Sequence, residues 1–222
     1  MASGTDTGAL GGEHAVAMNR MYRYQRHIYD LTRKYYLLGR DRTIAELDLP
    51  AGGSLLEVGC GTGRNLLLAQ KLFPSAHLSG LDISAEMLTS VRANFRGMPN
   101  QPTLRVADAT DFRAEDFGSA GYDRVMISYA LSMIPDWERA IDASLAALKP
   151  GGSLHIVDFG QQERLPRGFG RLLRAWLTRF HVTPRATLRR VLEDRQKGLG
   201  GTLQFEEIGR GYAWRAVFTV SN

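Results

Sequence analysis

Short apolar runs alternate with longer segments of helical periodicity along most of the chain, which is typical of a parallel α/β sheet. Residues 55–58 predict a short buried strand, and residues 65–72 predict a helix with one apolar face. Further strands are predicted at 76–81, 103–106, 122–128, 153–159, 202–208 and 212–220, with helices after Ser84 and at 137–148. The last two strands alternate in polarity around Gly209-Arg210-Gly211, so we expect an antiparallel hairpin. It would complete a seven-stranded, mostly parallel sheet with helices on both faces.

The amino-terminal region carries tyrosines and basic residues in place of strand patterns. Residues 1–14 are mostly small and polar and predict a disordered tail. Residues 15–39 and 40–50 predict helices, and five tyrosines stand among the bases of the first segment. These helices either pack on the sheet with their phenol groups in water or form a lid over a ligand, since an aromatic face attracts a cation. We favour the second interpretation, in which residues 15–50 form a lid and Tyr29 is its main contact with the ligand.

The composition is that of one globular domain, with 222 residues, 44% of them hydrophobic and 23% charged. A single cysteine, Cys60, excludes an internal disulfide bond and suits a reducing compartment. The chain has no run of ~18 apolar residues that would span a membrane, and its first residues lack the apolar core of a secretion signal. We therefore expect a cytoplasmic protein. The net charge of +5 indicates anionic partners, either a membrane surface or a nucleic acid.

Arginines concentrate in a basic amphipathic insertion at 160–200, after the fifth strand. They are Arg164, Arg167, Arg171, Arg174, Arg179, Arg185, Arg189, Arg190 and Arg195. One helical face carries Leu172, Leu173, Trp176, Leu177 and Phe180. Such a helix either lies in a membrane interface, where each arginine near anionic lipid contributes about 1 kcal/mol, or packs on the sheet with its arginines in water. We weigh peripheral membrane contact through residues 164–190 equally with packing, and place RNA phosphate binding behind both.

The turn between the first strand and its helix has the composition of a ligand site. Gly59, Gly61 and Gly63 alternate there, and the acid Glu57 lies two residues before the first of them. Glycines let the backbone approach a ligand closely. A dinucleotide site has Gly-x-Gly-x-x-Gly spacing. The spacing here differs, and a carboxylate suits a cationic ligand better than a pyrophosphate. The alternative is a tight turn that binds nothing.

This turn resembles the first motif of the class I S-adenosylmethionine-dependent methyltransferases, which have a Rossmann-like fold. The resemblance implies S-adenosylmethionine as cofactor, with Glu57 near its methionine end. Asp82 ends the second strand about twenty residues after the turn, where a carboxylate meets the ribose hydroxyls in this class of fold. Asp108 follows the third strand, where the family places an acid against the adenine amino group. The alternatives are a plain turn aspartate at Asp82 and a loop cap at Asp108.

The loop after the fourth strand should face the methyl group, because it lies at the carboxyl end of a central strand. It lacks the Asn/Asp-Pro-Pro-Tyr/Phe motif of many DNA-base methyltransferases, which counts against a base substrate. Arg40 either reaches a cofactor carboxylate or is a solvated helix arginine. The residues that we assign to the cofactor are Tyr29, Arg40, Glu57, Gly59, Cys60, Gly61, Gly63, Asn65, Asp82, Ile83, Met87, Asp108, Ala109, Thr110 and Ser128. The catalytic candidates are Tyr24, Tyr29 and Tyr129.

Two histidines, His27 and His155, are the remaining candidates for a chemical role. Water or His27 is expected to carry off the proton released by an amine acceptor. His155 lies inside a strand and is expected to be a core residue. No cluster of His, Cys and acidic residues with metal-ligand spacing appears, so no metal is expected.

Residues 18–33 and 35–40 narrow the resemblance. They are similar to the bacterial betaine-lipid N-methyltransferases, which convert diacylglycerylhomoserine to diacylglyceryl-trimethylhomoserine. The resemblance implies three methylations of a lipid amine at the inner face of the membrane, with the enzyme that makes diacylglycerylhomoserine as a candidate partner. An α-amino group with a pKa of ~7.7–8.0 is partly neutral at working pH, so no dedicated base is required. Two alternatives stay open: methylation of phosphatidylethanolamine or a quinone, and a noncatalytic protein of this fold that binds RNA or a partner.

Overall fold

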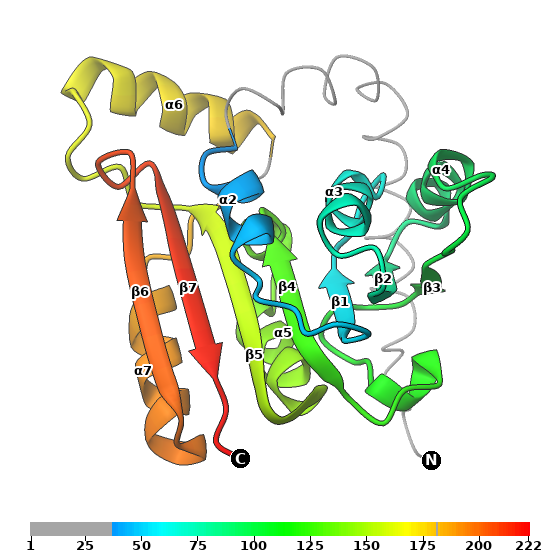
Figure 1. The fold of residues 1–222 in the computed structure, drawn as a ribbon. Helices are drawn as coiled ribbons and strands as arrows, with labels where there is room; N and C mark the ends of the chain where they lie inside the picture. Colours follow the sequence, from blue (N-terminus) through cyan, green and yellow to red (C-terminus); the bar gives the residue numbers. More distant parts are fainter. Residues whose placement is uncertain (1–36, 181) are drawn as a thin grey trace, which may run out of the picture.

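The computed structural model describes residues 37–180 and 182–222, which are coloured in Figure 1. The expected tail and most of the expected lid lie outside these residues. So do Tyr24, His27 and Tyr29, whose assignments stay predictions.

Seven strands form one sheet in the order β3-β2-β1-β4-β5-β7-β6. Their bounds are β1 Ser54–Val58, β2 His77–Asp82, β3 Thr103–Val106, β4 Tyr122–Ser128, β5 Leu148–Phe159, β6 Thr202–Ile208 and β7 Ala213–Thr219. The neighbours among β1 to β5 pair in parallel, while β7 is antiparallel to both β5 and β6. The expected mostly parallel sheet with a C-terminal antiparallel hairpin is therefore confirmed.

The chain builds this sheet outward from β1 to β3 and then returns to place β4 on the other side of β1. In open α/β sheets, ligands bind outside the carboxyl ends of the strands at the point where the strand order reverses. Here that point lies between β1 and β4, so their carboxyl ends mark the edge where a site is expected.

Helices cover both faces of the sheet (Figure 1). One face carries α2 Arg40–Ala45, α3 Arg64–Leu72 and α4 Ala85–Asn94, and the other carries α5 Trp137–Ala146 and α7 Leu188–Leu199. The alternation of β1 explains the two cores: Leu55 packs with the α2–α4 layer, while Leu56 and Val58 pack with the α5 and α7 layer. Glu57 shares the period of Leu55, which directs its carboxylate toward the α3 side.

The structure corrects several expected boundaries. Strand β5 begins at Leu148, although a strand was expected only from residue 153, so the Lys149–Gly152 stretch belongs to the strand, with a register shift against β4. Helix α2 ends at Ala45, although helix was expected to about residue 50. The basic insertion forms two helices, α6 Arg167–Arg179 and α7, in place of one amphipathic unit. Pro184 lies between them, and proline disfavours helix at itself and at the preceding residue.

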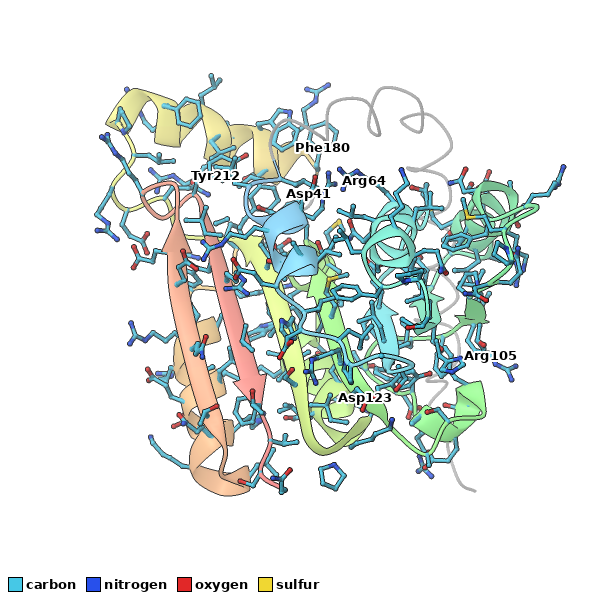
Figure 2. The ribbon with its side chains drawn as sticks, in the orientation of Figure 1. Asp41, Arg64, Arg105, Asp123, Phe180 and Tyr212 are labelled. Carbon is cyan, nitrogen blue, oxygen red and sulfur yellow. The ribbon has the colours of Figure 1, made fainter. Side chains whose placement is uncertain are left out.

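Helix α6 crosses the molecule beyond the carboxyl end of β5 and the β6–β7 turn (Figure 1). A third apolar cluster joins it to the sheet and consists of Leu37, Tyr129, Val157, Phe159, Leu173, Leu177, Val182, Tyr212 and Ala213. Figure 2 shows Tyr212 below this helix and Phe180 at its end. The cluster therefore lies at the same edge of the sheet as the expected site.

Two short 3₁₀ turns complete the fold. They are η1 Ala114–Phe117, before β4, and η2 Leu131–Met133, in the loop that follows β4.

Candidate functional site

The three alternating glycines form a turn that other residues would strain. Gly59, Gly61 and Gly63 have φ angles of 71°, 53° and 78°, a region that L-residues with a Cβ rarely occupy. A Cβ built on Gly59 would lie 2.8 Å from the Cβ of Ala130, and one on Gly63 would lie 2.7 Å from Cγ1 of Val91. The turn thus packs directly against the loop after β4 and against α4, while Gly59 and Gly61 stay partly exposed.

Asp82 ties this turn to the end of β2. Its Oδ2 accepts a hydrogen bond from the Gly61 N–H at 2.8 Å, and its Oδ1 accepts one from the Ser84 N–H at 2.9 Å. Ser84 in turn caps α4, because its hydroxyl accepts from the Met87 N–H at 3.4 Å. A carboxylate has about four lone-pair sites, so one carboxylate can bind several donors at once. Ile83 and Met87 are partly buried and buried beside it.

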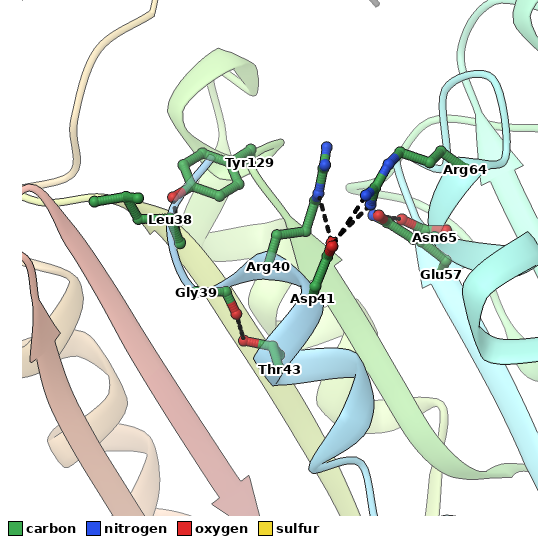
Figure 3. A network of polar contacts seen from close by, with 9 residues as sticks. All are labelled: Leu38, Gly39, Arg40, Asp41, Thr43, Glu57, Arg64, Asn65 and Tyr129. Carbon is green, nitrogen blue, oxygen red and sulfur yellow. Dashed lines mark hydrogen bonds and ion pairs between the residues drawn. The ribbon is translucent and has the colours of Figure 1, made fainter. Parts of the chain in front are cut away.

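A buried carboxylate lies beneath the turn. Glu57 is 1% exposed, and its Oε1 accepts a hydrogen bond from Nδ2 of Asn65 at 2.6 Å (Figure 3). A carboxylate kept in such a site needs partners, because burying a charge without them is costly. Burial, together with the negative charges of Glu57 and Asp82, raises the pKa of the Cys60 thiol. Cys60 is therefore a neutral packing residue and not a nucleophile.

An ion-pair network joins α2 to α3 beside this carboxylate (Figure 3). Arg64 binds Asp41 with both terminal nitrogens, at 2.7 and 3.0 Å, and Nε of Arg40 lies 3.3 Å from the same carboxylate. The hydrogen bond from Arg64 holds the pKa of Asp41 below its usual range. Arg40 is only 5% exposed, so the solvated alternative for this arginine is wrong. Its guanidinium lies beside Asp41 and Arg64, at the same edge of the sheet as the glycine turn (Figure 3).

Ser128 ends β4 and Tyr129 follows it next to the turn, as expected from their place in the chain. Tyr129 adopts a left-handed backbone with φ 54° and donates its N–H to the Val157 carbonyl at 2.7 Å. Its hydroxyl donates to the Leu38 carbonyl at 2.6 Å, and burial raises the pKa of the phenol. The Tyr129 hydroxyl thus ties the loop after β4 to the segment before α2. Its assignment as a catalytic residue stays a prediction.

Asp108, Ala109 and Thr110 follow β3 at the same edge. Oδ1 of Asp108 accepts from both the N–H and the hydroxyl of Thr110, at 2.8 and 2.9 Å. The expected loop-cap role of Asp108 is therefore present, and the exposed carboxylate can still meet a ligand. The backbone also connects to β2, since the Ala107 N–H donates to the Asp82 carbonyl at 3.2 Å.

Sequence reasoning missed four charged residues at this edge: Asp41, Arg64, Asp158 and Arg185. Asp158 is the last residue but one of β5, and Asp82 is the last of β2, so the same argument from strand ends would have selected Asp158. The three others pair with residues far away in sequence or with backbone carbonyls, which leave no spacing signal. Among residues 37–180 and 182–222, no group of three or more His, Cys or acidic side chains could hold a metal ion.

Comparisons with known proteins find several methyltransferases. Residues 55–152 match the model of a family described as a methyltransferase domain. Over 129 residues, the chain is 32% identical to a phosphatidylethanolamine N-methyltransferase of Cereibacter sphaeroides, covering 57% of this chain and 60% of the relative. Over 141 residues it is 27% identical to a demethylmenaquinone methyltransferase of Listeria monocytogenes, covering 62% and 58%. The chain thus spans about three fifths of the length of these curated relatives.

Solved structures share the fold. The plantazolicin methyltransferase BpumL, in complex with a desmethyl analogue and SAH, superposes with a TM-score of 0.68 at 15% identity, covering 96% of this chain and 98% of that one. A putative methyltransferase bound to the Trm112 activator of Haloferax volcanii gives the same TM-score and identity, with 87% and 93% coverage. At such low identity the likeness shows the fold.

Proposed function

We propose that this chain, which carries a class I methyltransferase domain over residues 55–152, transfers methyl groups from S-adenosylmethionine to the amine of a membrane lipid. The observation that carries the proposal is a pair of carboxylates around one glycine turn. Glu57 is buried beneath the turn, and Asp82 binds its backbone at the rim. A cationic nucleoside cofactor needs an acceptor pair for its ribose and a negative environment for its charge, and this arrangement offers both.

Each part of the turn then has a role toward the cofactor. The glycines allow close approach of the backbone, Glu57 and Arg40 serve the methionine end, and Asp82 accepts from the ribose. The adenine is served by Asp108, Ala109 and Thr110, with Ile83 and Met87 as apolar contacts. Cys60, Asn65 and Ser128 complete the lining, and Tyr29 belongs to the same proposal from outside the described residues. When bound, the cofactor supplies an activated methyl group. The protein's task is to align the acceptor and exclude water.

We place the acceptor beside the third apolar cluster, whose aromatic rings suit a lipid amine. Tyr129 and Phe159 pack edge to face with centroids 4.8 Å apart, and Tyr212 lies 6.0 Å beyond Phe159. Aromatic walls tolerate an ammonium that grows with each methylation. The amine must be neutral to attack, and burial lowers an amine pKa, so proton loss to water or His27 suffices. Positioning of the amine by Tyr24 and Tyr29 is part of the proposal.

The lipid that we favour is diacylglycerylhomoserine, methylated three times to the betaine lipid. A second candidate is phosphatidylethanolamine, which the 32% identity to a phosphatidylethanolamine N-methyltransferase favours. A third is demethylmenaquinone, which the 27% identity to a demethylmenaquinone methyltransferase favours. The proposal includes the enzyme that makes diacylglycerylhomoserine as a source of substrate, and no nucleic-acid partner.

Membrane contact is proposed through residues 164–190, at the inner face of the membrane. Leu173 and Leu177 of the expected apolar face pack inward, while Phe169 and Leu172 are 51% and 69% exposed. Arg171 and Arg174 are exposed on the same helix. Since α6 lies at the edge of the sheet where the glycine turn opens, docking of this helix would bring that edge to the bilayer (Figure 1). No helix among the described residues has both the length and the apolarity to cross a membrane.

The test is incubation of the full chain with isotopically labelled S-adenosylmethionine and vesicles of one candidate lipid at a time. We expect diacylglycerylhomoserine to gain one, two and then three methyl groups, read by mass spectrometry. If only phosphatidylethanolamine or demethylmenaquinone gains the label, that lipid is the substrate in place of diacylglycerylhomoserine, and the proposed enzyme class stands. Retention on RNA together with no uptake of S-adenosylmethionine would overturn the proposal in favour of a noncatalytic protein.

A further inference from the structure

The loop 129–134, which follows β4, is held by a carboxylate that is buried at the end of β5. Asp158 is 2% exposed. Its Oδ2 accepts from the Ser132 N–H at 3.0 Å, and its Oδ1 accepts from the Phe159 N–H at 2.7 Å. Burial raises the pKa of Asp158, which shows that the fold tolerates an expensive group at this position. An apolar side chain could fill the space, but it could not bind the loop backbone.

The segment before α7 holds the same loop from its other side. Nε of Arg185 donates to the Leu131 carbonyl at 3.0 Å, and Nη2 donates to the Ile134 carbonyl at 2.5 Å. The Thr183 N–H donates to the Ser132 carbonyl at 2.8 Å. Asp158 and Arg185 also attract each other electrostatically. Three carbonyls of the loop therefore depend on residues that are distant in sequence.

The loop has little regular structure of its own. It contains the three-residue turn η2, in which the Met133 N–H donates to Ala130 at 2.9 Å and the Ile134 N–H donates to Leu131 at 3.2 Å. A single 3₁₀ turn is short and has poor hydrogen-bond geometry. Its shape must be imposed from outside, and Asp158 and Arg185 are the charged groups that impose it.

Asp158 and Arg185 together form a clamp on the loop 129–134. The position of the loop gives this clamp a function. Ala130 lies against Gly59, because a Cβ built on the glycine would be 2.8 Å from the alanine Cβ. Tyr129 reaches across to the Leu38 carbonyl. The loop thus forms the wall between the glycine turn and the aromatic cluster under α6, where the proposed cofactor and the proposed acceptor would meet.

We propose that Asp158 and Arg185 are positioning residues that hold the loop 129–134 as the acceptor-side wall of the site. This inference rests on the proposed function for its catalytic consequence. A displacement of about 1 Å in a wall of this kind is enough to misplace the acceptor. The cofactor turn has its own supports, in Asp82 and Asn65, so loss of the clamp should affect the acceptor and spare S-adenosylmethionine.

The kinetic test compares Arg185→Gln, Arg185→Lys and the control Arg139→Gln, whose arginine is exposed on α5 and lies outside residues 164–190. With two charge-assisted hydrogen bonds lost, Arg185→Gln should raise the KM for the lipid acceptor about tenfold, while the Kd for S-adenosylmethionine changes less than about twofold. Arg185→Lys should recover part of the effect, and Arg139→Gln should match the wild type. The proposal would be overturned if Arg185→Gln weakened the acceptor KM and the S-adenosylmethionine Kd equally, or if it changed neither constant.

A second measurement needs no substrate. Hydrogen exchange of the Ser132, Met133 and Ile134 amides should be about tenfold faster in Arg185→Gln and in Asp158→Asn than in the wild type or Arg139→Gln. Unchanged protection would overturn the clamp even if the enzyme is active. If no lipid accepts a methyl group, faster exchange still supports the clamp, so the proposed function and this inference fail separately. Should Asp158→Asn not fold, the two Arg185 variants decide.

Discussion

The two sides of the proposed site are built from contacts of very different range. On the cofactor side, Asn65 binds Glu57 across 8 residues, and Gly61 binds Asp82 across 21. On the acceptor side, Tyr129 binds Leu38 across 91 residues, and Arg185 binds Leu131 across 54. A strand, a turn and a helix that follow one another fix the first group. The second group exists only when the whole sheet has assembled.

This difference teaches where specificity can change at low cost. The cofactor side is one local unit whose parts support each other, so it can be retained while the rest varies. The acceptor side depends on the order of distant elements and on single side chains such as Arg185. Relatives that act on phosphatidylethanolamine and on demethylmenaquinone match the chain over similar shares of its length, which is consistent with a shared cofactor unit.

The largest effect should come from breaking the cofactor side. Asp82→Ala is expected to weaken S-adenosylmethionine binding by at least about 100-fold, because it removes the ribose acceptor and frees two backbone N–H groups, with charged hydrogen bonds contributing about 1.5–3 kcal/mol each. Isothermal titration calorimetry measures this. Asp82→Asn, which keeps one acceptor oxygen, should lose less.

Asp123→Ala is the matched control for that change. Asp123 also accepts from a backbone N–H of β1, that of Ser54 at 2.8 Å, but it lies at the opposite end of the sheet (Figure 2). It should lower stability and leave cofactor affinity unchanged. A folded Asp82→Ala variant with normal affinity would remove the ribose assignment.

The next effect concerns the glycine turn itself. Gly63→Ala should lower the free energy of unfolding by about 2–3 kcal/mol, because it adds left-handed strain and a Cβ that meets Val91 at 2.7 Å. Gly97→Ala separates these causes, since Gly97 has a φ of 80° and nothing within 4 Å of the built Cβ. It should cost only about 1 kcal/mol. Urea unfolding measures both, and equal costs would show that the Val91 contact relaxes freely.

The same contrast in range explains what could be predicted from the sequence. Strands 103–106, 122–128 and 202–208 were predicted with the observed bounds, because apolar alternation is a local signal. Asp82 was located by its distance from the turn. By contrast, Lys149-Pro150-Gly151-Gly152 has the residues of a turn, yet β5 starts before it, because pairing of Leu148 with Tyr122 extends the strand.

The acceptor side shows the limit of such reasoning. Periodicity grouped Leu172, Leu173, Trp176, Leu177 and Phe180 on one face. It could not show which of them the sheet covers. The third apolar cluster buries Leu173 and Leu177 and leaves Leu172 exposed. Asp158 and Arg185 bind backbone groups. Because every residue has a backbone, no residue pattern predicts this clamp.

A third prediction breaks the acceptor side at the membrane. Arg171→Glu with Arg174→Glu should weaken binding to anionic vesicles by about 30-fold or more, since each arginine near the surface contributes about 1 kcal/mol. Cofactor affinity should not change. Sedimentation with phosphatidylcholine vesicles, with and without phosphatidylglycerol, measures the effect.

The control pair for the membrane test is Arg92→Glu with Arg96→Glu, two exposed arginines at and just after the last turn of α4, which packs against a face of the sheet and not at its end. This pair should retain vesicle binding. Equal losses in both pairs would indicate attraction by net charge alone, and no loss in either would favour α6 as a packing helix with solvated arginines.

The smallest effect sharpens the role of Tyr129. Tyr129→Phe removes the donor to the Leu38 carbonyl and should cost about 1 kcal/mol of stability, with about a fivefold rise in the acceptor KM. Because the hydroxyl is already committed to a backbone carbonyl, kcat should stay within about fivefold, whereas loss of a general acid or base typically costs about 10²–10⁴-fold. Tyr122→Phe, in a buried tyrosine at the other end of β4, is the control and should spare both kinetic constants. A fall in kcat beyond about 100-fold for Tyr129→Phe alone would make this tyrosine catalytic and not a tie between the loop and α2.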